Sequence, residues 1–238
     1  LLVPSLRAIR KKFPKAEIVF HGTQLTENIL RQFPEYIDRF VTVNIEKLAR
    51  RPAYLFQMFR HLRSLRCDVA VDFEQWSRLS ALFVIASGAT VRAGFRTKGQ
   101  HRHAAFTHAV ERDPARHEVD NFLSLANLLT NARGSRDLEI KVDEASLIRV
   151  QGFLAKHGWQ KNVPILTAHP GCGTHGFPRE WAPKNYAALI NRLSKENKIF
   201  VVVSGTQSEI RVMNAVSQSL DSHPAAYVIE MPDDMIAL

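Results

Sequence analysis

Long hydrophobic runs and cysteines are both scarce in this chain of 238 residues. The longest apolar candidate, residues 81–91, is far shorter than the roughly 18 residues that a membrane-spanning helix needs. Only two cysteines occur, Cys67 and Cys172, and they lie far apart. This number excludes a disulfide scaffold and suits a reducing compartment. A starting Met and a signal-peptide pattern are also missing, and the opening LLVPSLRAIRKKFP has the pattern of the inside of a folded element.

Acidic residues are scarce only in the first part of the chain. Residues 1–100 hold 17 Lys and Arg against 8 Asp and Glu, whereas residues 101–238 hold 15 of each. The net charge of +9 therefore belongs to the first part. This asymmetry indicates an anionic partner there, such as a membrane surface, a phosphorylated glycan or a nucleic acid. For any single charge, a solvated helix face is an equally good explanation.

Helix-like and strand-like segments alternate along the chain, which predicts βαβ units, parallel sheets and the α/β class. The segment 198–205, with an unbroken apolar run in its middle, is typical of a strand that is buried on both faces. We expect two doubly wound domains, residues 1–144 and 145–238. The first starts on a helix and the second stops after three strands, so we expect both to be incomplete. The predicted helices are residues 5–13, 24–33, 53–67, 77–88, 117–130, 144–158, 183–197 and 208–220, and the predicted strands are 16–22, 39–44, 68–73, 90–95, 163–168, 198–205 and 225–231.

The segment VPILTAHPGCGTHGFPREW, residues 163–181, contains three glycines with the spacing G-x-G-x-x-G. A dinucleotide fingerprint needs such glycines in the turn that opens a helix directly after the strand. Here the strand ends near Ala168, the next helix begins near Pro183, and Pro178 interrupts the segment between them. The spacing therefore argues against a dinucleotide site.

A metal site is the second interpretation of this segment. His169, Cys172 and His175 have spacings that could suit zinc, but structural zinc sites use four ligands, usually in two pairs. No second pair follows them in the sequence. We therefore expect no metal site.

The third interpretation is a phosphate-binding loop, because ligands of doubly wound folds bind at the carboxyl ends of parallel strands. Glycines let backbone N–H groups approach an anion, and the guanidinium of Arg179 suits phosphate oxygens. The N-terminus of the helix that begins near Pro183 also favours negative charge. These features predict a ligand with a diphosphate. A purely structural loop with a packed Trp181 is the alternative.

The segment AHPGCGTHGFPREWAPKNYAALINRL resembles the start of the C-terminal domain of glycosyltransferase family 9, the ADP-heptose:lipopolysaccharide heptosyltransferases. Three further segments are similar to parts of the same family in the same order. They are LLVPSLRAIRKKFPKAEIVFHGT, CDVAVDFEQWSRLSALFVIASGATVRAGF and VVVSGTQSEIRVMNAV. The resemblance covers nearly the whole chain.

The resemblance implies a GT-B fold, in which two Rossmann-like domains hold the acceptor on the N-terminal side and the nucleotide-sugar on the C-terminal side. It implies an inverting transfer of a sugar, a heptose from ADP-heptose, to a lipopolysaccharide core or related glycan, with no required metal or cofactor. The partners would be an ADP-sugar and an anionic glycolipid, with no nucleic acid. The location would be cytoplasmic, at the cytoplasmic face of the inner membrane.

The resemblance also assigns residues. Arg179 would lie near the donor phosphates, Glu209 near the donor ribose, and the Gly171–Gly173 backbone along the same pocket. The expected donor-binding residues are His169, Gly171, Gly173, Thr174, Arg179, Trp181, Gly205 and Glu209. In the basic loop 96–103, the expected acceptor-binding residues are Arg96, Lys98, His101 and Arg102.

No catalytic residue is assigned. The resemblance puts the family's base, an Asp, before residue 1, and an Asp-x-Gly-x-x-His donor motif after residue 238. Asp72 and Glu74 follow a predicted strand, where an acid is more often a cap or turn residue. A non-catalytic protein that binds a nucleotide or polyanion therefore stays open as an alternative. A nucleic-acid module would interleave aromatic and basic residues on one surface, whereas the phenylalanines of the first part fit core positions.

Overall fold

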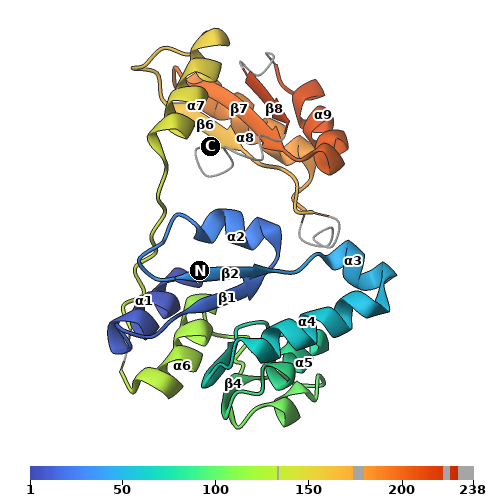
Figure 1. Ribbon diagram of the computed structural model, residues 1–238. Helices are drawn as coiled ribbons and strands as arrows, with labels where there is room; N and C mark the ends of the chain where they lie inside the picture. The colour runs from blue at the N-terminus through green and yellow to red at the C-terminus, as the bar shows by residue number, and fades with distance from the viewer. Residues whose placement is uncertain (133, 174–179, 222–225, 230–238) are drawn as a thin grey trace. The chain divides into compact units, whose positions relative to one another are not determined.

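The computed structural model describes residues 1–132, 134–173, 180–221 and 226–229 (Figure 1). The chain divides into two compact units, Leu1–Lys141 and Val142–Leu238. The sequence placed this boundary after residue 144. Every strand pairing in the described residues is parallel, and the α/β class is confirmed. None of the helices in the described ranges has the length and apolar character to cross a membrane.

The first unit contains a two-stranded and a three-stranded parallel sheet, in the orders β1-β2 and β3-β4-β5. Helices α4 and α5 pack side by side and enclose a core with β2 (Figure 1). Helix α6 packs against α1 and also covers β4. The elements are α1 (Val3–Lys12), β1 (Val19–Gly22), α2 (Gln24–Leu30), β2 (Arg39–Thr42), α3 (Ile45–Arg50), α4 (Pro52–Ser64), β3 (Val69–Asp72), α5 (Arg78–Ser87), β4 (Val91–Arg96), the 3-10 helix η1 (Arg102–Ala105), β5 (His108–Glu111) and α6 (Glu118–Thr130).

Local signals set the ends of several of these helices. The side chains of Thr23 and Asn44 accept hydrogen bonds from backbone N–H groups and begin α2 and α3. Pro52 lies in the first turn of α4, where its missing N–H costs nothing. Helix α5 ends at Gly88, whose φ of 70° is a conformation that glycine adopts without strain.

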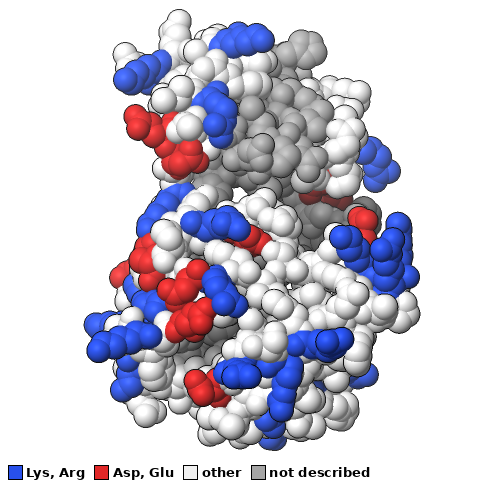
Figure 2. Space-filling view, in the orientation of Figure 1, with Lys and Arg blue, Asp and Glu red and all other residues white. Residues whose placement is uncertain are grey.

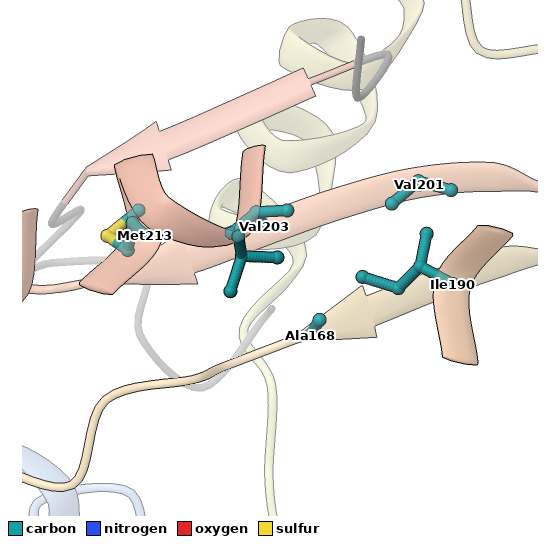
Figure 3. Close-up of a cluster of buried hydrophobic side chains, with 6 residues drawn as sticks. Ala168, Ile190, Val201, Val203 and Met213 are labelled. Carbon is teal, nitrogen blue, oxygen red and sulfur yellow. The ribbon is translucent and has the colours of Figure 1, made fainter. Parts of the chain in front are cut away.

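The second unit has one parallel sheet in the order β6-β7-β8. Its central strand is buried along its whole length, as the apolar run predicted. Phe200 and Val202 pack with α7 on one side of the sheet. Val201 and Val203 pack with α8 and α9 on the other (Figure 3). The elements are α7 (Glu144–Lys156), β6 (Ile165–Ala168), α8 (Pro183–Glu196), β7 (Phe200–Gly205), the 3-10 helix η3 (Gln207–Glu209), α9 (Ile210–Gln218) and β8 (Ala226–Ile229).

Three elements escaped the sequence prediction, namely α3, η1 and β5. Helix α3 has no buried residue, so its apolar pattern carries no signal. Strand β5 lies at the end of its sheet and is largely exposed, which leaves no alternation to detect. The 3-10 helix η1 is too short to show periodicity. Its position matters, because it carries Arg102.

Candidate functional site

The candidate site lies in the second unit, where the parallel strands β6 and β7 end side by side. Ala168, the last residue of β6, is in register with Val203 of β7. His169 therefore follows β6 directly beside the end of β7. Such a carboxyl edge is where ligands of open α/β sheets bind.

Glu209 is the centre of this site. Its Oε1 accepts a hydrogen bond from the backbone N–H of Gly173 at 2.8 Å. Its Oε2 accepts from the backbone N–H and from the hydroxyl of Thr206, both at 2.9 Å. Thr206 and Glu209 thus form a capping box at the start of η3. One carboxylate fixes both the turn after β7 and the glycine loop after β6.

These hydrogen bonds determine the charge state of Glu209. Burial alone would raise the pKa of this carboxyl, which is 9% exposed. The N–H groups of Thr206 and Gly173 and the Thr206 hydroxyl lower it, and so does nearby His169. The net result is a pKa below the ordinary value, so Glu209 is a carboxylate at neutral pH.

The glycines of the site serve different purposes. At Gly171, an added Cβ would overlap the Glu209 carboxylate, so the close approach of the two requires glycine. At Gly173 the added Cβ would meet no atom, but the φ of +69° favours glycine. At Gly205 the added Cβ would overlap the thioether of Met213. The N–H of Gly173 already donates to Glu209, so it does not point freely toward a ligand.

His169 and Trp181 are both exposed, and His169 contacts the site directly. The Nε2 of His169 is 3.5 Å from Oε2 of Glu209, and its Nδ1 is 3.3 Å from Oγ of Ser204. The ring of Trp181 is half-exposed and meets Tyr186 of α8 edge to face at 4.9 Å. Helix α8 begins after Ala182, which provides no side-chain cap. Two further expected donor residues, Thr174 and Arg179, lie outside the described residues, as do His175, Gly176 and Pro178.

The four expected acceptor-binding residues of the first unit do not share one environment. Arg96, Lys98 and His101 are exposed, and Arg96 pairs with Glu111 at 3.3 Å. The side chain of Arg102 is fully buried. It donates to the Asp72 carboxylate, to the backbone oxygen of Glu74 and to the Ser80 hydroxyl. The expectation that Arg102 binds acceptor phosphates is therefore wrong, because its guanidinium is used inside the protein.

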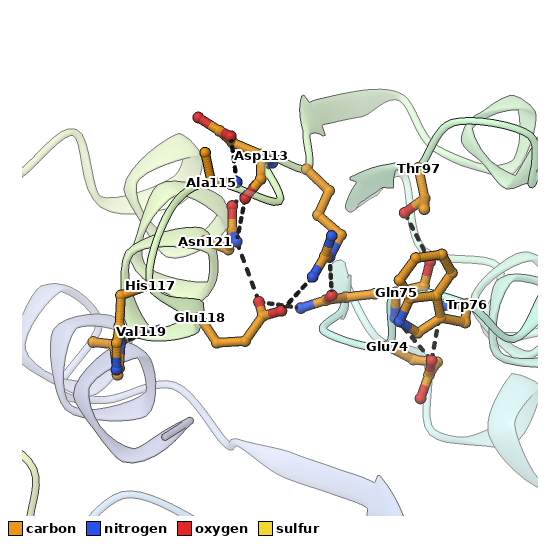
Figure 4. Close-up of polar contacts among 11 residues, drawn as sticks. Glu74, Gln75, Trp76, Thr97, Asp113, Ala115, His117, Glu118, Val119 and Asn121 are labelled. Atoms are coloured by element: carbon orange, nitrogen blue, oxygen red, sulfur yellow. Dashed lines mark hydrogen bonds and ion pairs between the residues drawn. The ribbon is translucent and has the colours of Figure 1, made fainter. Parts of the chain in front are cut away.

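Two acids lie at the end of β3, Asp72 as its last residue and Glu74 just after it, and both make hydrogen bonds within the unit. Burial raises the pKa of Asp72, although Arg102 opposes this effect. Oε1 of Glu74 accepts from the backbone N–H groups of Gln75, Trp76 and Ser77 (Figure 4). These bonds overcome the effect of burial and lower the pKa of Glu74. Asp72 is thus bonded inside the protein, whereas Glu74 is exposed and uses only its Oε1 in these bonds.

A polar network that the sequence did not reveal joins the loops after β3 and β5 (Figure 4). Glu118 accepts from Gln75 at 2.7 Å, from Arg112 at 2.5 Å and from Asn121 at 3.2 Å. Arg112 also lies over the ring of Trp76, 5.1 Å from its centroid. The signal that could have found this network is the pairing of β4 with both β3 and β5, which brings these loops to one edge.

The described part of the chain contains no group of three or more His, Cys, Asp or Glu residues placed to hold a metal ion. Of the three residues that the sequence suggested for zinc, His169 and Cys172 are described and His175 is not.

Solved structures with the same architecture define the class of this fold. A glycosyltransferase family 9 protein from Veillonella parvula DSM 2008 matches with a TM-score of 0.73 and 15% identity over 94% of this chain. ADP-heptose lps heptosyltransferase II from E. coli matches with a TM-score of 0.71 and 19% identity over 100% of it. E. coli heptosyltransferase WaaC, solved with ADP, matches with a TM-score of 0.65 and 15% identity over 96%. The chain spans 63%, 71% and 70% of these three proteins, respectively. The fold is of the GT-B type.

The sequence itself identifies the family. The sequence model of glycosyltransferase family 9 (heptosyltransferase) matches residues 55–228. A comparison with curated proteins gives no match. The chain belongs to glycosyltransferase family 9, and the resemblance seen in its motifs is confirmed.

Proposed function

We propose that this protein is an inverting glycosyltransferase that binds a nucleotide-sugar at the carboxyl edge of β6 and β7. The donor is ADP-heptose, and the acceptor is a lipopolysaccharide core or a related anionic glycan. The reaction takes place at the cytoplasmic face of the inner membrane and needs no metal or other cofactor. Two relatives by fold are described as heptosyltransferases, one of them solved with ADP.

The observation that carries this proposal is the Glu209 cluster. A carboxylate has about four acceptor positions, and Gly173 and Thr206 use three of those on Glu209. One acceptor position therefore remains for a hydroxyl of the donor ribose. His169 lies beside it with an accessible ring, and the half-exposed ring of Trp181, at the start of α8, can stack on a nucleotide base.

In the proposed reaction, an acceptor hydroxyl oxygen bonds to the anomeric carbon of the sugar. The bond from that carbon to the diphosphate oxygen breaks, and ADP leaves with the electron pair. The hydroxyl proton passes to a base. Asp72 does not supply that base, since it is buried and bonded to Arg102, and Glu74 is not assigned that role, since its Oε1 holds the turn after β3. A cation at Arg179 would stabilise the leaving diphosphate, as the family resemblance implies.

Isothermal titration of ADP, UDP, GDP and NAD into the chain tests this proposal. We expect ADP to bind, and an Arg179→Ala variant to bind it more weakly. Lys161→Ala removes one exposed charge elsewhere in the same unit and serves as the matched control. Preference for UDP or GDP would keep the fold and change the donor.

Two results would contradict the proposal. Preferential binding of NAD would restore the dinucleotide interpretation of the glycines. Binding of ADP without transfer from ADP-heptose to a lipopolysaccharide acceptor would favour the non-catalytic alternative. The observation behind this alternative is that the buried Asp72 is bonded to Arg102.

A further inference from the structure

Two exposed stripes on neighbouring helices of the first unit combine arginine with large apolar side chains. On α4 the stripe is Phe56, Arg60 and Arg63, and on α5 it is Arg78, Leu82 and Ile85, all exposed. Both follow the spacing i, i+4, i+7, which places three residues on one face of a helix. On α4 this face lies opposite the buried Met58 and Leu62.

The two stripes belong to one surface. Helix α4 packs against α5, with the rings of Phe59 and Phe83 edge to face at 5.8 Å beneath the surface. The guanidinium of Arg63 lies against Gly88 at the end of α5, where an added Cβ would overlap it. We call this surface the α4–α5 surface. Figure 2 shows Lys and Arg side chains over α3 and along α4, with few acidic side chains among them.

The cations of this surface have no acidic partner in the described residues. This holds for Arg60, Arg63 and Arg78, and for Lys47, Arg50 and Arg51 on α3 and its turn into α4, while Arg78 also donates to the backbone oxygen of Gln100 at 3.1 Å. Arg66 and Arg92 are the other described arginines of the unit without an acid. In the same unit the arginines with acidic partners are Arg7, Arg10, Arg31, Arg39, Arg96, Arg102, Arg112, Arg116 and Arg136. The positive charge on α3, α4 and α5 is therefore available to an external anion.

The apolar side chains indicate which anion. Phe56 is 63% exposed, Ile85 51% and Leu82 47%, and exposed apolar side chains grouped on one surface mark an interaction site. A nucleic acid would use basic residues interleaved with several aromatic rings on which bases stack, whereas of the three apolar side chains here only Phe56 has a ring and Leu82 and Ile85 are aliphatic. An anionic bilayer attracts arginine at the headgroups and receives aliphatic side chains below them.

We propose that the α4–α5 surface docks the protein onto an anionic lipid bilayer, with Arg60, Arg63 and Arg78 at the headgroups and Phe56, Leu82 and Ile85 in the interface. The biological role of this docking rests on the proposed function, since an enzyme that uses a lipid-linked acceptor must work at a membrane. The surface itself is independent of the donor site in the second unit.

Co-sedimentation with lipid vesicles tests the docking without any sugar donor. The full chain is mixed with vesicles of equal parts phosphatidylglycerol and phosphatidylcholine, and with vesicles of phosphatidylcholine alone. We expect binding only to the anionic vesicles, and a steep decrease with salt, because the Debye length falls to about 8 Å at physiological ionic strength. Equal binding to both vesicles, or none, would overturn the proposal.

Matched variants locate the surface. Each basic charge near an anionic membrane strengthens binding about fivefold, so Arg60→Glu should weaken it about 25-fold. Lys161→Glu, an exposed charge in the second unit, should weaken it far less. Leu82→Gln should weaken binding roughly fivefold, whereas Leu147→Gln on α7 should leave it unchanged, although Leu147 is equally exposed at 44%. Equal effects in surface and control variants would overturn the assignment.

Two controls keep the outcomes separate. Circular dichroism of each variant confirms that it is folded, and all four positions are exposed, so folding should not change. A single-stranded polynucleotide serves as the competitor. If it displaces the vesicles and binds the Leu82→Gln variant with the same affinity as the wild-type protein, the surface is a nucleic-acid site instead. Vesicle binding in a chain that fails to bind ADP would leave the docking intact and refute only the proposed donor.

Discussion

Glu209 in the unit Val142–Leu238 is bonded to backbone amides and a hydroxyl, whereas Asp72 in the unit Leu1–Lys141 is bonded to a buried arginine as well as to the N–H of Glu74. Glu209 accepts from Gly173 and Thr206, and Asp72 accepts from the buried Arg102. Both acids lie at the carboxyl edge of a parallel sheet. Position at this edge therefore does not define a ligand site. What distinguishes the two edges is whether the acid is already neutralised by a cation of the protein.

This difference in bonding predicts that the Asp72–Arg102 pair affects mainly stability, and that the residues around Glu209 affect mainly ligand binding. A buried carboxylate whose partner is an equally buried guanidinium contributes to the fold, because loss of either partner leaves an isolated charge. A carboxylate that holds loop amides keeps its negative charge and an accessible neighbour, His169. We expect substitutions in the first pair to change mainly the free energy of unfolding. Substitutions around Glu209 should change mainly the affinity for a nucleotide.

The largest expected effect follows from breaking the buried pair. Arg102→Met removes the cation and leaves Asp72 charged and buried, which should lower the free energy of unfolding by about 3–5 kcal/mol. Arg96→Met removes an exposed ion pair with Glu111 and should cost less than about 1 kcal/mol. Urea unfolding followed by circular dichroism measures both variants. Equal unfolding midpoints for the two variants would show that the Arg102–Asp72 pair does not stabilise the fold. Asp72 and Glu209 would then not differ in the way argued above.

The next effect concerns the close approach of Gly171 to Glu209. Gly171→Ala introduces a methyl group that overlaps the carboxylate, so the loop or the acid must move. Such overpacking should lower the free energy of unfolding by about 1–3 kcal/mol. Because the displaced loop no longer presents the same groups, we also expect the affinity for ADP to fall in a calorimetric titration. Hydrogen exchange at the Gly173 amide should become faster in the same variant.

Gly152→Ala is the matched control for that prediction. Gly152 lies within α7, and an added Cβ there would meet no atom within 4 Å. We expect unchanged ADP affinity and a gain in stability of about 0.5–1 kcal/mol, since alanine favours helix. An unchanged affinity in Gly171→Ala would mean that the carboxylate and the loop do not act together.

The sequence was sufficient for features that depend on local pattern. The apolar run at residues 198–205 predicted a strand that is buried on both faces, and the structure confirms this for β7. The order of motifs along the chain predicted family 9, which the family match confirms. These features depend on composition and spacing within a few residues, which a single sequence displays directly.

The sequence was not sufficient for contacts between distant residues. Arg102 and Asp72 are 30 residues apart, and Gly173 and Glu209 are 36 apart. In the loop 96–103 no periodicity distinguishes the buried Arg102 from the exposed Arg96. All four basic residues of the loop were therefore predicted to bind the acceptor. Only the register of β3 with β4 brings Asp72 near the loop that carries Arg102. A contact of this kind becomes visible only when the strands are paired.

The smallest expected effect is the pH dependence that Glu209 contributes. Its folded-state pKa lies below the ordinary value of 4.5, so the carboxylate stabilises the folded state above that pH. This contribution should be lost as pH falls through the folded-state pKa.

Glu209→Gln keeps the size of the side chain but removes the charge, and should lower the free energy of unfolding by about 1–2 kcal/mol near neutral pH. Urea unfolding of both proteins at a series of pH values should give a constant difference at neutral pH, and this difference should shrink below 4.5. A difference that instead grows in acid would mean that the folded state favours protonated Glu209, and the glycine loop would then not be held by a carboxylate.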